Sequence, residues 1–459
     1  MKHFIAVAIG SRLRKTAGVF CCVLLALVAC NASSADQSQS KNGRDWIATP
    51  LSLADALNLA LKQNRTVQKS SRDLEISHGV AMEVRAIAIP KLQANGEYTD
   101  TDKNALEPFP GQPQPHQSWN AGIQIVQSLY EGGRFRSAIR AARLTREQAV
   151  LAHQTVIADT LLATRVAYYD VLLAAQDIVV REASVELLGK ELNDQQQRFD
   201  SGTVPRFNVL RAEVAVANAK PALIRAKNNL RIAKNNLLNL LGYDLSRDSW
   251  EDIPLQLTDT LDIGDHTIGL SDAIMQALGN RTELGALRKA EKLRAEDITQ
   301  ARSGKLPSVQ AFAGWGWRNR SFSSDVTDSI DGWQIGVRGT WNIFDGFQTR
   351  GKVIQAKAAH EKSKLELDDA SGQIQIEVRT AHSSFTQARE LLESQKKVQE
   401  QAEEALRLAR SRAESGVGTQ LDVLNAETAL TEARTTQIQA KHEYAVAVAK
   451  LERAIGATR

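Results

Sequence analysis

The most constraining feature of this sequence is an internal duplication. Leu53–Leu57 returns as Leu270–Ile274, displaced by 217 residues. Three residues are then lost between the copies, and all later matches are displaced by 214. These later pairs are Trp119 with Trp333, Tyr130–Gly132 with Phe344–Gly346, Ser201–Gly202 with Ser415–Gly416, Val209–Glu213 with Val423–Glu427, and Leu241–Gly242 with Ile455–Gly456. Matches held at one displacement over such a length indicate two equivalent halves, so one architecture has to explain both.

The formal net charge of +4 is misleading, because it is concentrated at the N-terminus. Lys2, Arg12, Arg14 and Lys15 lie in the first 15 residues with no acidic residue among them. Without these four, 53 of the 57 basic residues remain against 53 acidic ones, so the rest of the chain is near neutral. We therefore expect no nucleic-acid partner, since such proteins carry a basic patch.

An apolar run from Ala17 to Ala29 follows these charges, and small and polar residues come next. This order is typical of a secretory signal peptide, and the run is too short for a transmembrane anchor. Two cleavage sites compete. Leu27–Cys30 resembles a bacterial lipobox, which would make Cys30 the lipidated first residue, whereas Ser33–Ala35 suits ordinary signal peptidase. The lipobox is favoured because no cysteine follows Cys30, which also excludes disulfides and thiolate metal sites from the remainder.

Two pairs of segments alternate apolar and polar residues with the period of a β-strand. The apolar positions are Leu92, Ala94, Gly96 and Tyr98, then Trp119, Ala121, Ile123 and Ile125, then Val309, Ala311, Ala313, Trp315 and Trp317, then Trp333, Ile335, Val337, Trp341 and Ile343. Strands of about ten residues with one apolar face and aromatic residues near their ends are typical of a membrane β-barrel. An amphipathic hairpin packed on a soluble core is the alternative for either pair alone. The aromatic residues expected to face the membrane are Trp119, Trp315, Trp317, Trp333 and Trp341.

Helices are predicted before each pair of strands. A short helix begins in each half at a residue suited to an N-cap, Ser52 in the first and Ser271 in the second. A medium helix follows and ends before Pro90 or Pro307, since a proline disfavours helical geometry in the residue before it.

Two very long helices, at about 134–200 and 349–414, are predicted after the strands, each followed by a glycine turn and a return helix. At about 1.5 Å per residue each would reach roughly 100 Å, which no compact soluble domain needs. The return helices carry a heptad repeat, which implies left-handed supercoiling, and alanines at the seam allow close approach. Pro221 is expected to bend the first return helix locally. The heptad positions are Val209, Val216, Leu223, Leu230 and Leu237, then Val423, Leu430, Gln437, Tyr444 and Leu451.

Four strands per chain cannot close a membrane barrel, because about eight is the smallest number known. An open sheet edge cannot persist in lipid either, because its backbone polar groups would be unpaired. The chain is therefore predicted to oligomerise, so that the strands of several copies make one barrel and the helices continue away from the membrane as a tube. The predicted fold class is mainly α with a β-barrel portion.

Over essentially all of the mature sequence, the chain resembles outer-membrane efflux proteins of the TolC family. The motifs that carry the resemblance are the duplication, the strand-to-helix junctions and the helix-tip turns, at Ser128–Gly133, Asn342–Gly346, Arg198–Thr203 with Asn208–Leu210, and Ser415–Thr419 with Asp422–Leu424. The resemblance implies a homotrimer in the bacterial outer membrane, with a barrel of 12 strands, four from each copy, and a periplasmic α-helical tunnel. It also implies an exit duct for efflux or type I secretion, docked to a periplasmic adaptor and to an inner-membrane pump of the RND, ABC or MFS type.

The resemblance also implies a division of the chain into five parts. These are a signal peptide at 1–29, a lipid-anchored extension at 30–50, a first efflux repeat at 51–242, an equatorial linker at 243–268 and a second efflux repeat at 269–459.

In this family, acidic residues just after the tip turn line the closed periplasmic end and form an entrance gate. Asp422 occupies the first such position, Asn425 the second, and Asn208 the matching position of the first half. The aromatic residue and the arginine that latch the gate in the best-known members are absent, since Ala413 and Gly418 stand there. The alternative for Asp422 is an acid that offsets the dipole at a helix N-terminus, and both roles can hold together.

The tip turns themselves are implied to contact the adaptor. Gly202 and Gly416 suit the tight turn, because glycine adopts left-handed backbone conformations readily. The full set of expected adaptor-contacting residues is Gly202, Thr203, Gly416, Val417, Gly418 and Thr419.

An enzyme is not expected, and neither is a catalytic, cofactor or metal site. The histidines on predicted helices lack paired ligand spacing, and no glycine-rich phosphate loop or nucleophile elbow is present. A secreted coiled-coil scaffold or adhesin is the competing class of function, but it leaves the four amphipathic strands and the duplication unexplained. The sequence does not identify the exported cargo.

Overall fold

The computed structural model describes residues 49–106, 116–243, 253–264, 266–320, 325 and 327–457. The predicted signal peptide, Cys30, nearly all of the extension at 30–50 and part of the linker lie outside these residues. The segment Pro50–Arg459 forms one compact unit. None of the helices in the described ranges has a stretch long and apolar enough to cross a membrane.

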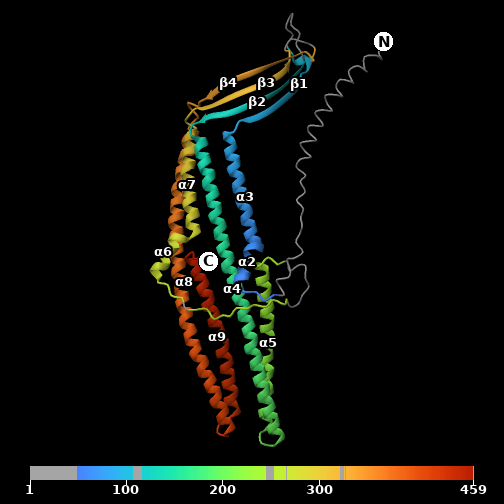
Figure 1. The fold of residues 1–459 in the computed structure, drawn as a ribbon, viewed down its shortest axis with the longest axis vertical. Helices are drawn as coiled ribbons and strands as arrows, with labels where there is room; N and C mark the ends of the chain where they lie inside the picture. The colour runs from blue at the N-terminus through green and yellow to red at the C-terminus, as the bar shows by residue number, and fades with distance from the viewer. Residues whose placement is uncertain are drawn as a thin grey trace, which may run out of the picture. The chain divides into compact units, whose positions relative to one another are not determined.

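The two halves of the chain contain the same elements in the same order (Figure 1). In the first half these are α2 (Leu53–Gln63), α3 (Arg65–Arg85), β1 (Lys91–Asp100), β2 (Gln117–Glu131), α4 (Arg134–Asp200) and α5 (Arg206–Leu240). In the second half they are α6 (Leu270–Asn280), α7 (Thr282–Ser303), β3 (Ser308–Asn319), β4 (Ser329–Thr340), α8 (Gln348–Glu414) and α9 (Gln420–Ala454). Short 3-10 turns lie at Ala86–Ala88 and Lys103–Ala105. The mainly helical fold with a small antiparallel sheet confirms the predicted fold class.

The helix boundaries agree with the sequence patterns in most places. The helices α4 and α8 contain 67 residues each, and α5 runs through Pro221 without interruption. Ser52 caps α2, since its hydroxyl accepts the backbone N–H of Asp55 at 3.2 Å. The prediction for Ser271 is wrong. The N-cap of α6 lies two residues earlier, at Gly269, which takes the extended backbone of an N-cap without a side-chain hydrogen bond.

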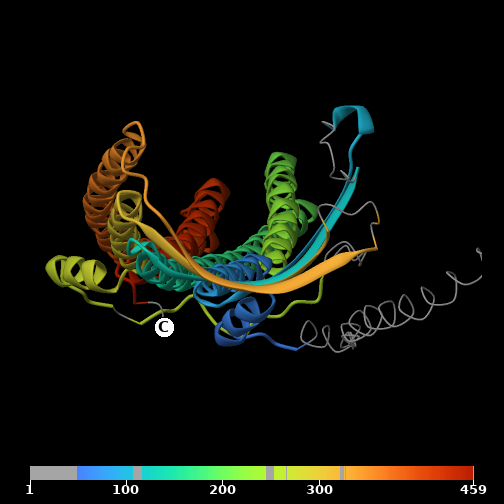
Figure 2. The ribbon, with the colours of Figure 1, turned by 90° about the horizontal axis from the view of Figure 1, so that it is seen from above.

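The helices lie side by side in one curved layer (Figures 1 and 2). Both α3 and α5 pack against α4, and both α7 and α9 lie between α4 and α8. The short helices α2 and α6 lie on the convex side of the layer (Figure 2). The layer therefore has two edges within the described residues, one made by α3 and α5 and the other by α8.

Asn64 joins α5 to α3, which meet end to end at one edge of the layer. Its side-chain oxygen accepts the N–H groups of Thr66 at 2.8 Å and Val67 at 3.3 Å, which caps α3. Its side-chain nitrogen donates to the carbonyl of Leu240 at 2.7 Å, which satisfies an unpaired group at the end of α5. One neutral amide thus forms hydrogen bonds with both the start of α3 and the end of α5.

Arg281 occupies the equivalent position in the second half, displaced from Asn64 by 217 residues. Its guanidinium donates to the carbonyl of Arg453 at 3.1 Å, at the end of α9, and forms an ion pair with Glu377 of α8 at 2.7 Å. The side chain of Arg453 is itself buried and pairs with Asp159 of α4 at 2.7 Å and with Glu283 of α7 at 2.5 Å. The second junction is therefore a charge network around two buried guanidinium groups, and it ties four helices together.

Gly242 and Gly456 make both junctions sterically possible. Their φ angles are +79° and +75°, in the left-handed region that favours glycine. A Cβ atom on Gly242 would lie 2.3 Å from the carbonyl oxygen of Gln63, and one on Gly456 would lie 3.0 Å from Cβ of Asn280. The duplicated Leu-Gly and Ile-Gly pairs of the sequence therefore mark the places where stacked helices meet.

We expect Gly242→Ala to destabilise the protein by roughly 3 kcal/mol or more, because left-handed strain and a clash with the Gln63 carbonyl add together. Gly202→Ala is the matched control, since its φ of +78° is nearly the same but nothing lies within 4 Å of the added Cβ. The control should cost only about 1–2 kcal/mol. Thermal unfolding of the two variants measures the difference, and equal shifts in Tm would contradict this account of the junction.

The four strands form one antiparallel sheet in the order β1-β2-β3-β4. The pairing of β2 with β3 joins the two halves, and β1 and β4 are the edges. The predicted extension of the last strand through Trp341 and Ile343 is wrong. The last pair is Ser308 with Thr340, and beyond it the indole of Trp341 donates to the carbonyl of Lys305 at 3.1 Å. No residue of β3 remains to pair with a longer β4.

The linker and the first residues of the unit are held to the helices by tyrosine hydroxyls. The hydroxyl of Tyr168 of α4, which is fully buried, lies 3.0 Å from the carbonyl oxygen of Leu51 and 2.9 Å from the carboxylate of Asp259, so these two acceptors share its one proton. Burial, with Asp259, raises the pKa of Tyr168 to about 12. In the second half the hydroxyl of Tyr444 donates to the carbonyl of Gly264 at 3.3 Å. These contacts fix Asp259 and Gly264 of the linker against the helical layer.

Candidate functional site

One face of the sheet is apolar and carries tryptophans. The register places Trp315 opposite both Ile123 and Trp333, so these three side chains share a face. Trp333 is 71% exposed. The same face carries all the apolar positions predicted within β1, β2, β3 and β4, and Trp119 and Trp317 lie on it as well. So wide an exposed apolar surface marks a place where something other than water covers it.

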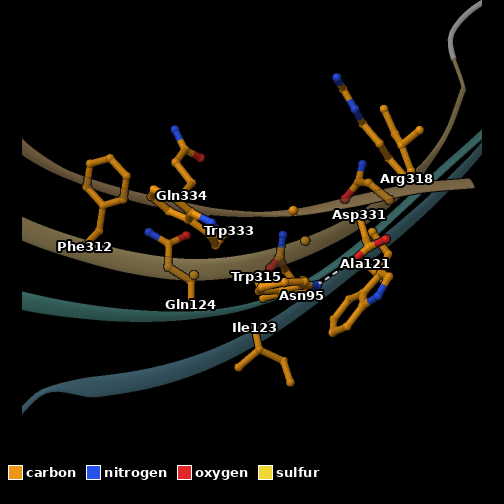
Figure 3. Close-up of a pocket in the computed structure, with 17 residues that line it drawn as sticks. Asn95, Ala121, Ile123, Gln124, Phe312, Trp315, Arg318, Asp331, Trp333 and Gln334 are labelled. Carbon is orange, nitrogen blue, oxygen red and sulfur yellow. Dashed lines mark hydrogen bonds between the residues drawn. The ribbon is translucent and has the colours of Figure 1, made fainter.

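The opposite face of the sheet is polar and lines a groove of about 590 Å³. Gln124, Gln334 and Arg318 project from this side and Ile123 from the other (Figure 3). A row of small residues crosses the groove, because Gly122 lies opposite Gly316 and Gly316 lies opposite Gly332. The polar residues that line it are Asn95, Asn120, Gln124, Arg318, Asp331 and Gln334.

The helix tips lie at the ends of α4 and α8 farthest from the sheet (Figure 1). In the first tip Gly202 has a φ of +78°, and the hydroxyl of Thr203 donates to the carbonyl of Arg198 at 2.8 Å. In the second tip Gly416 has a φ of +75°, and the N–H of Gly418 donates to the carbonyl of Arg412 at 2.8 Å. Glycine at these turns follows from the left-handed backbone.

The backbone of Gly418 lies so close to the end of α8 that no side chain fits there. A Cβ atom at this position would lie 2.9 Å from the backbone nitrogen of Ala413. This close contact accounts for the glycine at the position where the resemblance implied an arginine latch. Val417 is 73% exposed at the same turn.

Asp422 forms a capping box with Thr419 at the start of α9. The carboxylate accepts the backbone N–H of Thr419 at 2.9 Å, and the hydroxyl of Thr419 accepts the N–H of Asp422 at 3.2 Å. The hydrogen bond from the Thr419 backbone lowers the pKa of Asp422. The helix-capping interpretation of Asp422 therefore has direct geometric support, while the carboxylate itself stays exposed.

The two other predicted gate residues lie near this turn but make different contacts. The carbonyl of Asn208, at the start of α5, accepts the side-chain N–H of Gln420 at 3.2 Å, which links the two tips. Asn425 is exposed on α9. The structure thus brings Asn208 and Asp422 to one end of the molecule, on adjoining turns.

Sequence reasoning missed a buried carboxylate above the tips. Glu427 of α9 is 2% exposed, and its one hydrogen bond comes from Arg410 of α8 at 3.0 Å. Burial raises the pKa of Glu427, and Arg410 offsets this only in part. The signal was present, because Glu427 stands four residues after Val423 and three before Leu430, inside the apolar stripe of the heptad repeat.

Comparison with known proteins identifies the family. The profile of the outer membrane efflux protein family matches residues 56–243 and 273–457, one match in each half. The chain belongs to this family. The alkaline protease secretion protein AprF of Pseudomonas aeruginosa is 23% identical over 418 residues, which cover 88% of this chain and 84% of AprF.

The alignments with two further proteins cover most of this chain and most of each of those proteins. The outer membrane protein TolC of Escherichia coli is 23% identical over 428 residues, covering 88% of this chain and 83% of TolC. The crystal structure of the CmeC outer membrane channel of Campylobacter jejuni aligns with a TM-score of 0.76 at 18% identity, covering 88% of this chain and 85% of CmeC. As a member of this family, the protein is an outer-membrane channel component of efflux and secretion systems, with its helices on the periplasmic side.

We expect Asp422→Ala to speed hydrogen exchange at the Thr419 amide severalfold, because that amide loses its acceptor. Since the folded chain lowers the pKa of Asp422, the protection should be present above the ordinary aspartate pKa of about 3.9 and be lost as the pH falls through the lowered value. Asp200→Ala is the control, because the Asp200 carboxylate accepts a side-chain hydrogen bond from Gln196 at the first tip. Unchanged exchange at Thr419 in Asp422→Ala would contradict the capping box.

Proposed function

We propose that this protein is the exit duct of a tripartite efflux or type I secretion system, built from three copies of the chain. The observation that carries the proposal is the sheet, which has one apolar, tryptophan-bearing face and two open edges at the end of 67-residue helices. Closing these edges with other copies places the apolar face against lipid and the polar face around a lumen. A secreted scaffold would leave this surface without a purpose.

The edge of the helical layer supports the same assembly. Along α8 the apolar residues Ile354, Leu365 and Ile376 are exposed and follow one another at intervals of eleven residues. An interval of eleven keeps side chains on one nearly straight stripe of a helix. We propose that the α3–α5 edge of the neighbouring copy covers this stripe, so that three layers close into a periplasmic tunnel.

We expect Leu365→Asp to lower the fraction of assembled trimer by about tenfold or more, since it places a carboxylate in an apolar contact. Lys364→Asp is the control, because it places a carboxylate one position away, with a larger change of net charge, at a lysine that pairs with Glu361 at 2.9 Å. Mass measurement of the detergent-solubilised proteins gives the oligomeric state. Loss of the trimer in both variants, or in neither, would contradict the proposed interface.

At the periplasmic end, we propose that Asp422, Asn425 and Asn208 form the gate and that the tip turns contact the adaptor. Threefold assembly would bring three Asp422 carboxylates to the narrow end of the tunnel. Three negative charges held close together repel one another and attract multivalent cations. The adaptor contact would involve the exposed Val417 together with Gly202, Thr203, Gly416, Gly418 and Thr419. The partners are a periplasmic adaptor and an inner-membrane pump of the RND, ABC or MFS type.

Capping and gating at Asp422 can be separated by two substitutions. Asp422→Asn removes the charge but keeps an acceptor oxygen for the Thr419 amide, whereas Thr419→Val removes the capping hydroxyl but keeps the charge. If Asp422 belongs to the gate, block of single-channel current by hexaamminecobalt(III) should weaken by roughly tenfold in Asp422→Asn and stay unchanged in Thr419→Val. Asn425→Asp should strengthen the block by adding a second acidic ring.

Planar-bilayer recordings measure all three variants, and trimer assembly is checked in parallel. Unchanged block in both Asp422→Asn and Asn425→Asp would remove the gate assignment while leaving the channel itself in place.

A further inference from the structure

The polar face of the sheet carries two cations near its helical end. Lys91 is the first residue of β1 and Arg338 the third from the end of β4, so both lie where the strands meet the helices. Lys91 belongs to a cross-strand row that continues through Val126 and Phe312. Arg338 lies opposite Gln310, two residues along β3 from Phe312 and hence on the same face. Neither cation forms an ion pair with a residue of the described ranges.

Phe312 holds the Arg338 guanidinium at the surface of this face. The carbon of the guanidinium group lies 5.4 Å from the centroid of the Phe312 ring, within the range of a cation–π contact. The ring in turn lies over Gly336, its partner in the register, where an added Cβ would come within 2.7 Å of the ring. The glycine therefore lets the ring lie against the sheet, and the cation rests on the ring while Arg338 as a whole stays exposed.

Opposing charge near these cations is limited within the described residues. Glu131 of β2 lies in the last row of this face, opposite Ser308, and accepts the hydroxyl of Ser128 at 2.8 Å. It is two strands away from β4, or roughly 10 Å at the usual strand spacing. Glu97 lies toward the other end of β1, where it accepts the side-chain N–H of Asn120 at 3.1 Å. The helical end of the polar face is thus net positive.

Closing the barrel would concentrate this charge. Lys91 and Arg338 stand on β1 and β4, which are the two edge strands of the sheet. When β4 of one copy pairs with β1 of the next, the two cations come onto adjacent strands, each copy supplying one of them. A threefold assembly repeats the arrangement three times at one height of the lumen. Rings of basic side chains are a common way for a pore to favour anions.

We propose that Arg338, supported by Phe312, and Lys91 of the neighbouring copy form an anion-binding subsite at the periplasmic end of the barrel. The subsite favours cargo that carries several carboxylate or phosphate groups. This inference rests on the proposed function, in which the polar face lines the lumen of a closed barrel. It adds a cargo preference to the duct itself, at a point distant from the helix tips.

Binding of two polyanions to the purified, assembled protein tests the proposal. Titration calorimetry with inorganic tripolyphosphate and with benzene-1,3,5-tricarboxylate distinguishes phosphate from carboxylate cargo, and binding of either one supports the subsite. Arg338→Gln and Lys91→Gln should each raise the Kd of the bound anion by about tenfold, since each removes a hydrogen bond to a charged group. Arg320→Gln is the control, because the charge of Arg320 is already paired with Asp328 at 3.1 Å.

Three outcomes count against the proposal in different ways. Binding of neither anion by an assembled, conducting channel overturns the subsite and leaves the duct intact. An unchanged Kd in both Arg338→Gln and Lys91→Gln, or an equal loss in Arg320→Gln, overturns the assignment of these residues. Failure of the wild-type protein to assemble and conduct would instead overturn the proposed function on which the subsite rests.

Discussion

Unpaired backbone groups at two sheet edges are the constraint on which the rest of this structure depends. Each N–H or C=O group left without a partner in lipid costs several kcal/mol, so β1 and β4 cannot remain open there. Pairing β2 with β3 joins the two halves of the chain, and the outer edges of β1 and β4 then have no strand partner within the described residues. The helical layer shows the same organisation, because α8 ends one edge with an exposed apolar stripe.

The two halves of the chain stabilise the end-to-end junction of two helices with different side chains. Where two helices meet end to end, the first half uses the neutral amide of Asn64, which satisfies groups on both helices. The second half uses Arg281 with Arg453, and the two buried guanidinium groups need carboxylates from α4, α7 and α8. Removing these carboxylates would leave the buried guanidinium groups without a compensating charge, which costs more than losing one neutral hydrogen bond. The second junction therefore tolerates less change than the first.

At the second helix tip, Asp422 both caps a helix and presents an exposed charge. The capping box of Thr419 and Asp422 satisfies amides at the start of α9, and Gly418 lies against the end of α8, so the turn is fully specified within one chain. The carboxylate of Asp422 nonetheless stays exposed. A group that caps a helix can also contribute charge to a shared opening, because hydrogen bonding to one oxygen leaves the net charge in place.

The sequence by itself determined the repeated architecture, because helix and strand periods, prolines and glycine turns are local properties. The length of the two 67-residue helices and the apolar face of each strand could be predicted from these local patterns. Only the tertiary structure decided where β4 ends, since that depends on the last residue of β3 available for pairing. It also decided the roles of Arg281 and Arg338, and it supplied Arg410 as the partner of Glu427, whose burial alone the heptad repeat indicates. Which residues far apart in the chain contact one another leaves little periodic signal, so only the folded structure reveals these partners.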